Sequence, residues 1–175
     1  MRTRTVRSVI YLAGGLGLIV SIFTYLEALQ ASLQSLCTVN SYVSCTAVAN
    51  SGKTTLFGIS DSFIGIGGFV LILIVAAIAE QRRREMVWPY LLLFLTTGGV
   101  ALSAYFGYVE VGEIHALCPV CLTAYVFGVI VWVATIELVR RLRARARRVA
   151  AEATLPEPTP ATPSSSAPEP ETLRR

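Results

Sequence analysis

The chain has 175 residues, of which 54% are hydrophobic and only 15% are charged, and its mean hydropathy is +0.61. An average soluble domain carries about a quarter charged residues, and a chain of this length cannot bury so much apolar surface alone, so the composition excludes an ordinary soluble enzyme. The net charge is +4. The basic residues form short clusters beside apolar segments rather than a soluble basic face, so we expect a lipid bilayer and no nucleic acid as partner.

Four long segments are free of charged side chains except at or near their ends: about residues 8–27, 62–80, 86–109 and 116–138. Each is close to the roughly 20 residues that a helix needs to cross a bilayer, where backbone groups must hydrogen-bond within the segment. No small-x-small cleavage site ends the first segment, which we expect to be a retained helix. We therefore predict an all-α integral membrane protein, a four-helix bundle within a membrane domain of residues 1–149.

Arginines gather at three places, in residues 2–7, 82–84 and 140–148, whereas the other two connections contain only Lys53. Basic residues of short loops remain on the cytoplasmic side. This pattern predicts a multi-pass protein of the cell (inner) membrane with both termini cytoplasmic. The large first loop, about residues 28–61, is then extracytoplasmic.

Residues 150–175 are rich in Pro, Ser, Thr, Ala and Glu and have almost no large apolar side chains. Such a segment cannot bury a core, so we predict a disordered cytoplasmic tail with no second domain.

Glycines cluster within the first two predicted spans rather than after a strand, which excludes a dinucleotide-binding loop. We expect these small residues to allow close helix packing. They are Gly14, Gly15, Gly17, Gly65, Gly67 and Gly68.

The reactive residues of the chain are four cysteines, all on the predicted outer side: Cys37, Cys45, Cys118 and Cys121. Disulfides persist on that side of a cell membrane. The last two form a Cys-Pro-Val-Cys motif where the fourth span begins. A thiolate is favoured at a helix N-terminus, Pro119 is tolerated in a first helical turn, and Cys121 follows one turn later on the same face. The motif predicts thiol–disulfide exchange.

Other uses of the cysteines remain open at this point. Two structural disulfides are one alternative, although the short Cys-x-x-Cys loop is a poor staple. A four-cysteine zinc site is another, but zinc usually takes two close pairs and Cys37 and Cys45 are eight residues apart, so no metal is expected. Covalent haem attachment is excluded because Leu122, not histidine, follows the motif.

In its cysteine number, order and spacing, together with the four predicted spans, the chain resembles the vitamin K epoxide reductase family, in the form of a bacterial-type member without a fused thioredoxin domain. The resemblance covers roughly residues 8–140. The matching features are Cys37 and Cys45 with seven residues between them, Ser51, Phe57-Gly58, and the run from Cys118-Pro-Val-Cys121 to Tyr125.

The resemblance implies an enzyme, a quinone-dependent disulfide oxidoreductase with its active site on the extracytoplasmic side. Electrons would pass from a thioredoxin-like (DsbA-like) protein, supplied in trans, to Cys37/Cys45, then to Cys118/Cys121, and finally to menaquinone or ubiquinone. This route would support oxidative protein folding. The resemblance also implies quinone-binding roles for Tyr125, Ser51 and Asp61.

Two of the three quinone-site assignments have a simpler alternative. Tyr125 is also typical of an interfacial anchor, and Asp61 of a helix N-cap. His115 is expected to be an ordinary interfacial histidine, and Glu110 and Glu113 are expected to be solvated.

Three rival functions stay open. A DsbB-type oxidase has the same activity class but places its close cysteine pair first, whereas here it comes last. Reduction of vitamin K epoxide itself is the second. A non-enzymatic membrane scaffold with inert disulfides is the third; a transporter is disfavoured because no span carries an ionisable residue near its middle.

Overall fold

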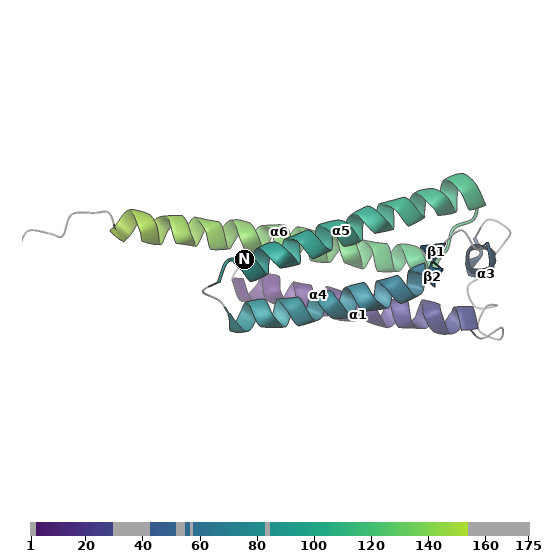
Figure 1. The fold of residues 1–175 in the computed structure, drawn as a ribbon, viewed down its shortest axis with the longest axis horizontal. Coiled ribbons are helices and arrows are strands. Elements are labelled where there is room, and N and C mark those ends of the chain that lie inside the picture. Colours follow the sequence, from purple (N-terminus) through teal and green to yellow (C-terminus); the bar gives the residue numbers. More distant parts are fainter. Residues whose placement is uncertain (1–2, 30–42, 52–54, 57, 83–84, 154–175) are drawn as a thin grey trace, which may run out of the picture.

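A computed structural model describes residues 3–29, 43–51, 55–56, 58–82 and 85–153 of the protein. Four long helices dominate it, namely α1 (Thr3–Leu29), α4 (Asp61–Gln81), α5 (Val87–Val109) and α6 (Pro119–Ala153) (Figure 1). All four are long and apolar enough to cross a membrane, which confirms the predicted all-α class with four spans. The termini's orientation across the membrane remains a prediction.

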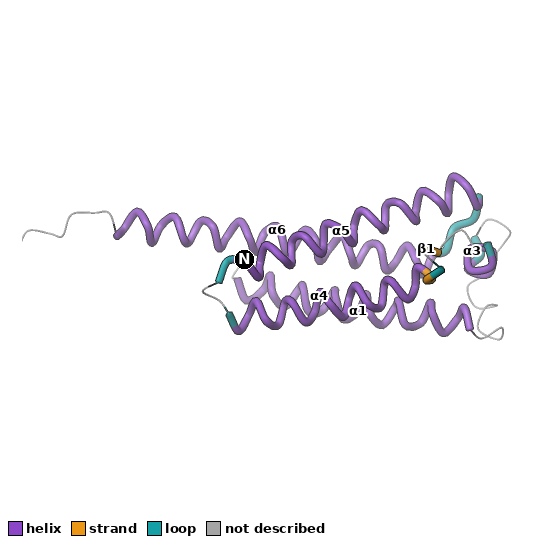
Figure 2. Tube along the Cα trace, in the orientation of Figure 1, coloured by secondary structure: helices purple, strands orange, loops and turns teal. Residues whose placement is uncertain are grey.

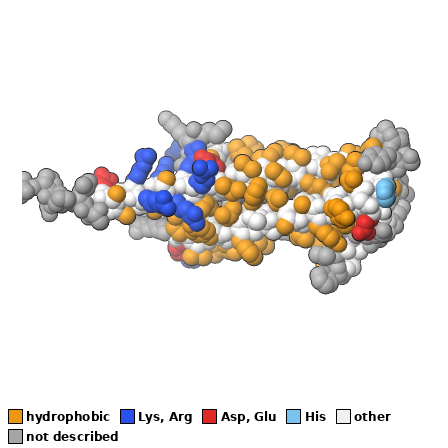
Figure 3. Space-filling model, turned by 90° about the horizontal axis from the view of Figure 1, so that it is seen from above, with side chains coloured by type: hydrophobic (Ala, Val, Ile, Leu, Met, Phe, Trp, Pro, Cys, Tyr) orange, Lys and Arg blue, Asp and Glu red, His pale blue; other side chains and the backbone are white. Residues whose placement is uncertain are grey.

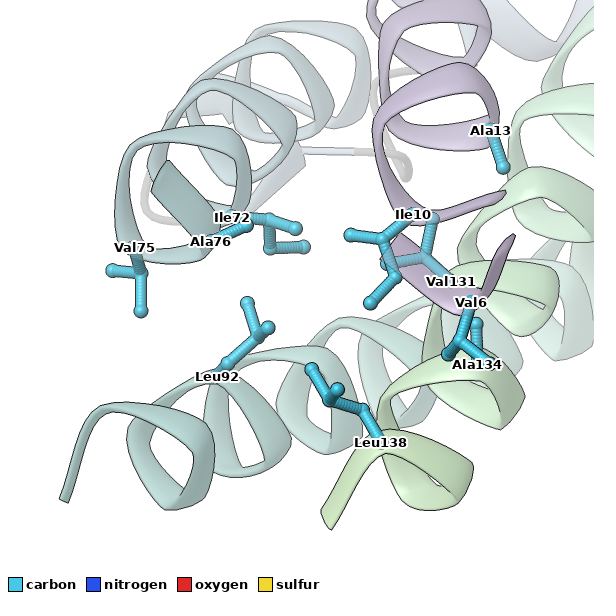
Figure 4. Close-up of a cluster of buried hydrophobic side chains, with 10 residues drawn as sticks. All are labelled: Val6, Ile10, Ala13, Ile72, Val75, Ala76, Leu92, Val131, Ala134 and Leu138. Atoms are coloured by element: carbon cyan, nitrogen blue, oxygen red, sulfur yellow. The ribbon is translucent and has the colours of Figure 1, made fainter. Parts of the chain in front are cut away.

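The long helices lie side by side as a bundle, in which α1 and α5 each pack against both α4 and α6. A cluster of buried apolar side chains joins all four helices in the half of the bundle that contains the N-terminus (Figure 4). It consists of Val6, Ile10, Ala13, Ile72, Val75, Ala76, Leu92, Val131, Ala134 and Leu138. Large apolar side chains also cover the outside, and Phe94 is 76% exposed. An apolar exterior of this kind suits lipid rather than water.

Short elements gather at the other end of the bundle (Figure 2). They are helix α3 (Cys45–Asn50), strands β1 (Thr55–Leu56) and β2 (Ile59–Ser60), and the π-helical turn η1 (Glu110–Ile114). The two strands form an antiparallel hairpin in which Thr55 pairs with Ser60 and Leu56 with Ile59. Gly58 lies in its turn with φ +82°, a conformation that glycine adopts without strain.

Charged side chains lie at the two ends of the bundle. Figure 3 shows the Lys and Arg side chains at the end where α6 projects, the apolar belt beside them, and the His with acidic side chains at the opposite end. The N-terminus and the α4–α5 connection also lie at the arginine end. The described arginines thus share one end of the bundle, opposite to the short elements.

The predicted close packing through glycine holds for three of the six positions. A Cβ at Gly17 would overlap the Phe69 ring, one at Gly14 would lie 3.0 Å from Leu73 Cδ2, and one at Gly65 would lie 3.0 Å from Ser21 Oγ. These contacts bring α1 and α4 close together. The remaining three, Gly15, Gly67 and Gly68, have open space where a Cβ would stand.

Helix α6 continues well past the predicted end of the fourth span at residue 138 and reaches Ala153. Residues 150–153, for which disorder was predicted, are therefore helical. The physical reason is their composition, Ala-Ala-Glu-Ala, since alanine and glutamate favour helix. Residues 154–175 lie outside the described part of the chain.

Candidate redox site

A short backbone bridge joins the end of the first loop to the segment just before α6. Val43 pairs with Leu117 in a parallel bridge, and the Ser44 N–H donates to the Leu117 carbonyl at 3.1 Å. Ser44 is also the N-cap of α3, where its side-chain oxygen accepts the Ala47 N–H at 3.2 Å. Cys45 is therefore the first residue of a capped helix that lies directly beside Cys118.

The Cys-Pro-Val-Cys motif begins α6 as the sequence predicts. Pro119 is the first helical residue, and Cys118 precedes it in the capping position, with its carbonyl accepting the Leu122 N–H at 3.0 Å. The Cys118 Sγ accepts the Cys121 N–H at 3.2 Å. This contact places the Cys118 sulfur at the N-terminus of α6, against a backbone N–H.

Three of the four cysteines meet in one buried cluster. The Sγ atoms of Cys45 and Cys118 are 3.1 Å apart, although the residues are 73 positions apart in the chain. Cys45 is in a disulfide, while Cys118 and Cys121 are free thiols. Cys37, the fourth predicted site residue, lies outside the described residues. A disulfide sulfur in contact with a free thiol is the arrangement through which thiol–disulfide exchange proceeds in either direction.

Beside the thiols, a tyrosine hydroxyl joins two carboxyl groups. The Tyr125 hydroxyl lies 2.8 Å from Asp61 Oδ2 and 3.1 Å from Glu110 Oε1. The other oxygen of Glu110, Oε2, accepts the Cys118 N–H at 3.2 Å. Helices α4 and α6 and the turn η1 each supply one member of this cluster, which is continuous with the redox motif.

The expectation that Glu110 is solvated is wrong, because Glu110 is 0% exposed. Helix α5 does not end where the apolar segment ends but passes into the π-helical turn η1, which begins with Glu110. His115 then reverses the chain with a left-handed φ of 57°, and the Ala116 N–H donates to the Glu110 carbonyl at 3.2 Å. Glu113, three residues after Glu110 in the same turn, is exposed, as predicted.

Two other sequence interpretations are decided by these contacts. Asp61 is not a helix N-cap: Ser60 occupies that position, and the Asp61 carboxylate instead contacts Tyr125. Ser51 ends α3, and its hydroxyl donates to the Val48 carbonyl at 2.7 Å. Ser51 is not among the described residues that line the pocket next to the motif, so the structure does not bring it together with Tyr125 and Asp61.

A pocket of about 310 Å³ opens beside this cluster between α1, α4, α5 and α6. Its walls are mostly apolar and include Phe69, Phe94 and Leu95, and its titratable side chains are Asp61, Cys121 and Tyr125. Such a pocket fits a lipophilic ring that carries oxygen atoms, since apolar walls with few convergent polar groups suit small ligands. Cys121 lines the pocket and Cys118 does not, so the second residue of the motif is the one that faces the pocket.

The same cluster also has a possible metal-binding arrangement. Ligand atoms of Asp61, Glu110 and Cys121 all lie within 4.8 Å of one another. The Tyr125 hydroxyl already contacts both carboxyl groups, so hydrogen bonding accounts for their closeness.

Four apolar helices that hold a dithiol beside a lipophilic pocket define a membrane oxidoreductase. A family model, the vitamin K epoxide reductase family, matches residues 8–136, more than half of the chain. The protein belongs to this family, whose members generally use quinones, and the resemblance noted from the cysteine spacing is confirmed. No curated protein matches the chain.

Proposed function

We propose that the protein is a quinone-dependent disulfide oxidoreductase that oxidises a thioredoxin-like (DsbA-like) protein on the extracytoplasmic side of the inner membrane. The observation that carries this proposal is the 3.1 Å contact between the Sγ atoms of Cys45, which is in a disulfide, and Cys118, which is a free thiol. Inert structural disulfides would not need a free thiol against them.

The proposed electron route begins with two thiols of the partner protein, which become a disulfide as they reduce the Cys37–Cys45 disulfide. The Cys45 thiolate then attacks Cys118 in the Cys118–Cys121 disulfide, and Cys121 leaves as a thiolate. Cys37 next attacks Cys45, which restores the loop disulfide and releases Cys118 as a thiol. The redox state of the described cysteines matches the end of this exchange.

In the last part of the route, Cys118 and Cys121 form a disulfide. The two electrons that this releases leave from Cys121 at the pocket. A quinone bound there would supply the oxidising power by accepting two electrons and two protons. Tyr125 and Asp61 would hold its oxygen atoms by hydrogen bonds. The apolar walls would bind its ring and tail.

The decisive experiment follows quinone absorbance with purified protein and a reduced thioredoxin-like protein. We expect turnover with ubiquinone or menaquinone in the wild type and none in Cys121→Ala. Cys37→Ser and Cys45→Ser should lose turnover with the protein donor but keep it with a small membrane-permeant dithiol. No turnover with either quinone or with vitamin K epoxide, from protein or small dithiols, would instead support a scaffold.

The proposed orientation can be tested separately by cysteine labelling. In a cysteine-free background, Glu113→Cys and Glu152→Cys place single thiols at exposed positions near opposite ends of the protein. A membrane-impermeant maleimide should label position 113 in intact cells and position 152 only after lysis. The reverse pattern would put the redox site on the cytoplasmic side.

A further inference from the structure

Resting on the proposed function, we infer that Glu110 holds a proton and relays it through Tyr125 and Asp61, so that protons from the Cys118–Cys121 dithiol reach the quinone. Glu110 does not line the pocket, whereas Asp61 and Tyr125 do. It is therefore a positioning and proton-holding residue that acts through the other two.

Tyr125 contacts more carboxyl groups than its one hydroxyl hydrogen can serve. A tyrosine hydroxyl has a single hydrogen, yet the Tyr125 oxygen lies within hydrogen-bond distance of two carboxyl groups, Asp61 at 2.8 Å and Glu110 at 3.1 Å. Both contacts are satisfied when Tyr125 donates to Asp61 and a protonated Glu110 donates to the Tyr125 oxygen. The arrangement is therefore a chain of hydrogen bonds with one proton to pass on.

The charges of the two carboxyl groups also favour a shared proton. Asp61 and Glu110 lie side by side, and among the described residues neither forms an ion pair with a Lys or Arg. Two adjacent unpaired carboxylates in a water-poor site are costly, so a shared proton stabilises them. The backbone N–H of Cys118 donates to Glu110 Oε2, and one such contact does not neutralise two charges.

The proposed reaction itself supplies the protons that the relay would carry. Forming the Cys118–Cys121 disulfide breaks two S–H bonds and releases two electrons and two protons, and reducing a quinone forms two O–H bonds from the same number of each. No outside acid is needed if the thiol protons can reach the pocket. Ligand atoms of Cys121, Asp61 and Glu110 lie within 4.8 Å of one another, a separation that one bridging water can span.

A purely structural role for Glu110, as an acceptor for the Cys118 N–H, makes a different prediction. Glu110→Gln keeps a side-chain oxygen acceptor at the same distance from the backbone. An amide, however, does not take up and release a proton as a carboxyl group does. A structural role predicts wild-type behaviour for Glu110→Gln and a loss only in Glu110→Ala. The relay predicts a loss in both, with partial recovery in Glu110→Asp.

The test compares Glu110→Gln with Glu113→Gln, an exposed position in the same turn. Pre-reduced protein is mixed with a soluble ubiquinone analogue in H₂O and in D₂O, and one turnover is followed. We expect Glu110→Gln to slow quinone reduction about 100-fold, within the range for general acid–base catalysis, and to change the solvent isotope effect. Glu113→Gln should match the wild type in both the rate of quinone reduction and the solvent isotope effect.

The second readout needs no quinone. An infrared spectrum of the quinone-free wild type should contain a protonated-carboxyl band that shifts in D₂O and is lost in Glu110→Gln but not in Glu113→Gln. Glu27→Gln is measured alongside, because Glu27 is also buried and its carboxyl oxygens have no hydrogen-bond partner among the described residues.

A wild-type spectrum without such a band overturns the inference even if Glu110→Gln fails to fold. Quinone reduction at the wild-type rate in Glu110→Gln also overturns it. A wild type that reduces no quinone would instead contradict the proposed function, while the infrared comparison would still decide whether Glu110 carries a proton.

Discussion

Each end of the bundle contains a tyrosine hydrogen-bonded to a glutamate, and the two pairs are built differently. At the arginine end, Glu80 accepts from the Tyr11 hydroxyl at 3.2 Å and from Arg7 at 3.3 Å, and its side chain is 40% exposed. At the cysteine end, Glu110 is fully buried and shares Tyr125 with a second acid, Asp61.

The difference lies in what surrounds the carboxyl group. Arg7 and solvent compensate Glu80, as is typical of a helix end near a membrane surface, and an exposed ion pair contributes only about 0–1 kcal/mol. Glu110 has thiols and a lipophilic pocket nearby instead. The same two residue types thus form a partly exposed ion-paired contact at one end and part of the proposed redox site at the other.

The largest effect should come from the sulfur that faces the pocket. Cys121→Ala removes the thiol proposed to deliver electrons, so quinone reduction should be lost altogether with any donor. Stopped-flow absorbance of the quinone measures this. Thr123→Ala, two residues further along α6 and exposed, should keep full activity, and a Cys121→Ala protein that still reduces quinone would contradict the electron route.

The two tyrosines provide a matched pair of substitutions. Tyr125→Phe removes the hydroxyl between Asp61 and Glu110 and should lower the quinone reduction rate about 10- to 100-fold, since a lost buried hydrogen bond to a charged group costs about 1.5–3 kcal/mol. Tyr11→Phe should leave the rate unchanged. Equal effects of the two changes on steady-state quinone kinetics would remove the functional distinction between the ends.

The two glutamates should differ in their contribution to stability. Glu110→Ala leaves the buried Cys118 N–H without its acceptor and should lower the free energy of unfolding by about 1–3 kcal/mol. Glu80→Ala should lower it by about 1 kcal/mol or less, because its ion pair is partly exposed. Thermal unfolding in detergent, followed by circular dichroism, compares them. A larger loss for Glu80→Ala would reverse the ranking.

The packing of α1 on α4 between the two ends should affect stability alone. Gly17→Ala places a methyl group against Phe69, which lines the pocket, and should cost about 1–3 kcal/mol through overpacking. Gly15→Ala, in open space, should be neutral or slightly stabilising because alanine favours helix. The same unfolding assay measures both, and equal stability would show that the Phe69 ring moves aside without cost.

The sequence predicted the parts of the site that depend on local properties. Charge-free lengths indicated four membrane helices, and a proline after the first cysteine of a Cys-x-x-Cys motif indicated that a helix begins there, as α6 does at Pro119. Tyr125, which the family resemblance implied as a quinone-site residue, lines the pocket together with Cys121.

Glu110 was missed because a charged residue after an apolar segment ordinarily marks the end of a span. Its position eight residues before Cys118, directly continuing the third apolar segment, was the available signal. The π-helical turn that buries it depends on how the chain folds back at His115, which no local pattern in the sequence indicated.

By itself, then, the sequence determined the family, the four helices and the position of the dithiol, because hydropathy and cysteine spacing act along a single segment. Only the tertiary structure decided which groups meet. Cys45 reaches Cys118 across 73 positions, and Tyr125 reaches Asp61 across 64. Both contacts depend on segments brought together by packing, and the burial that turns Glu110 from a surface charge into a proposed proton carrier depends on it as well.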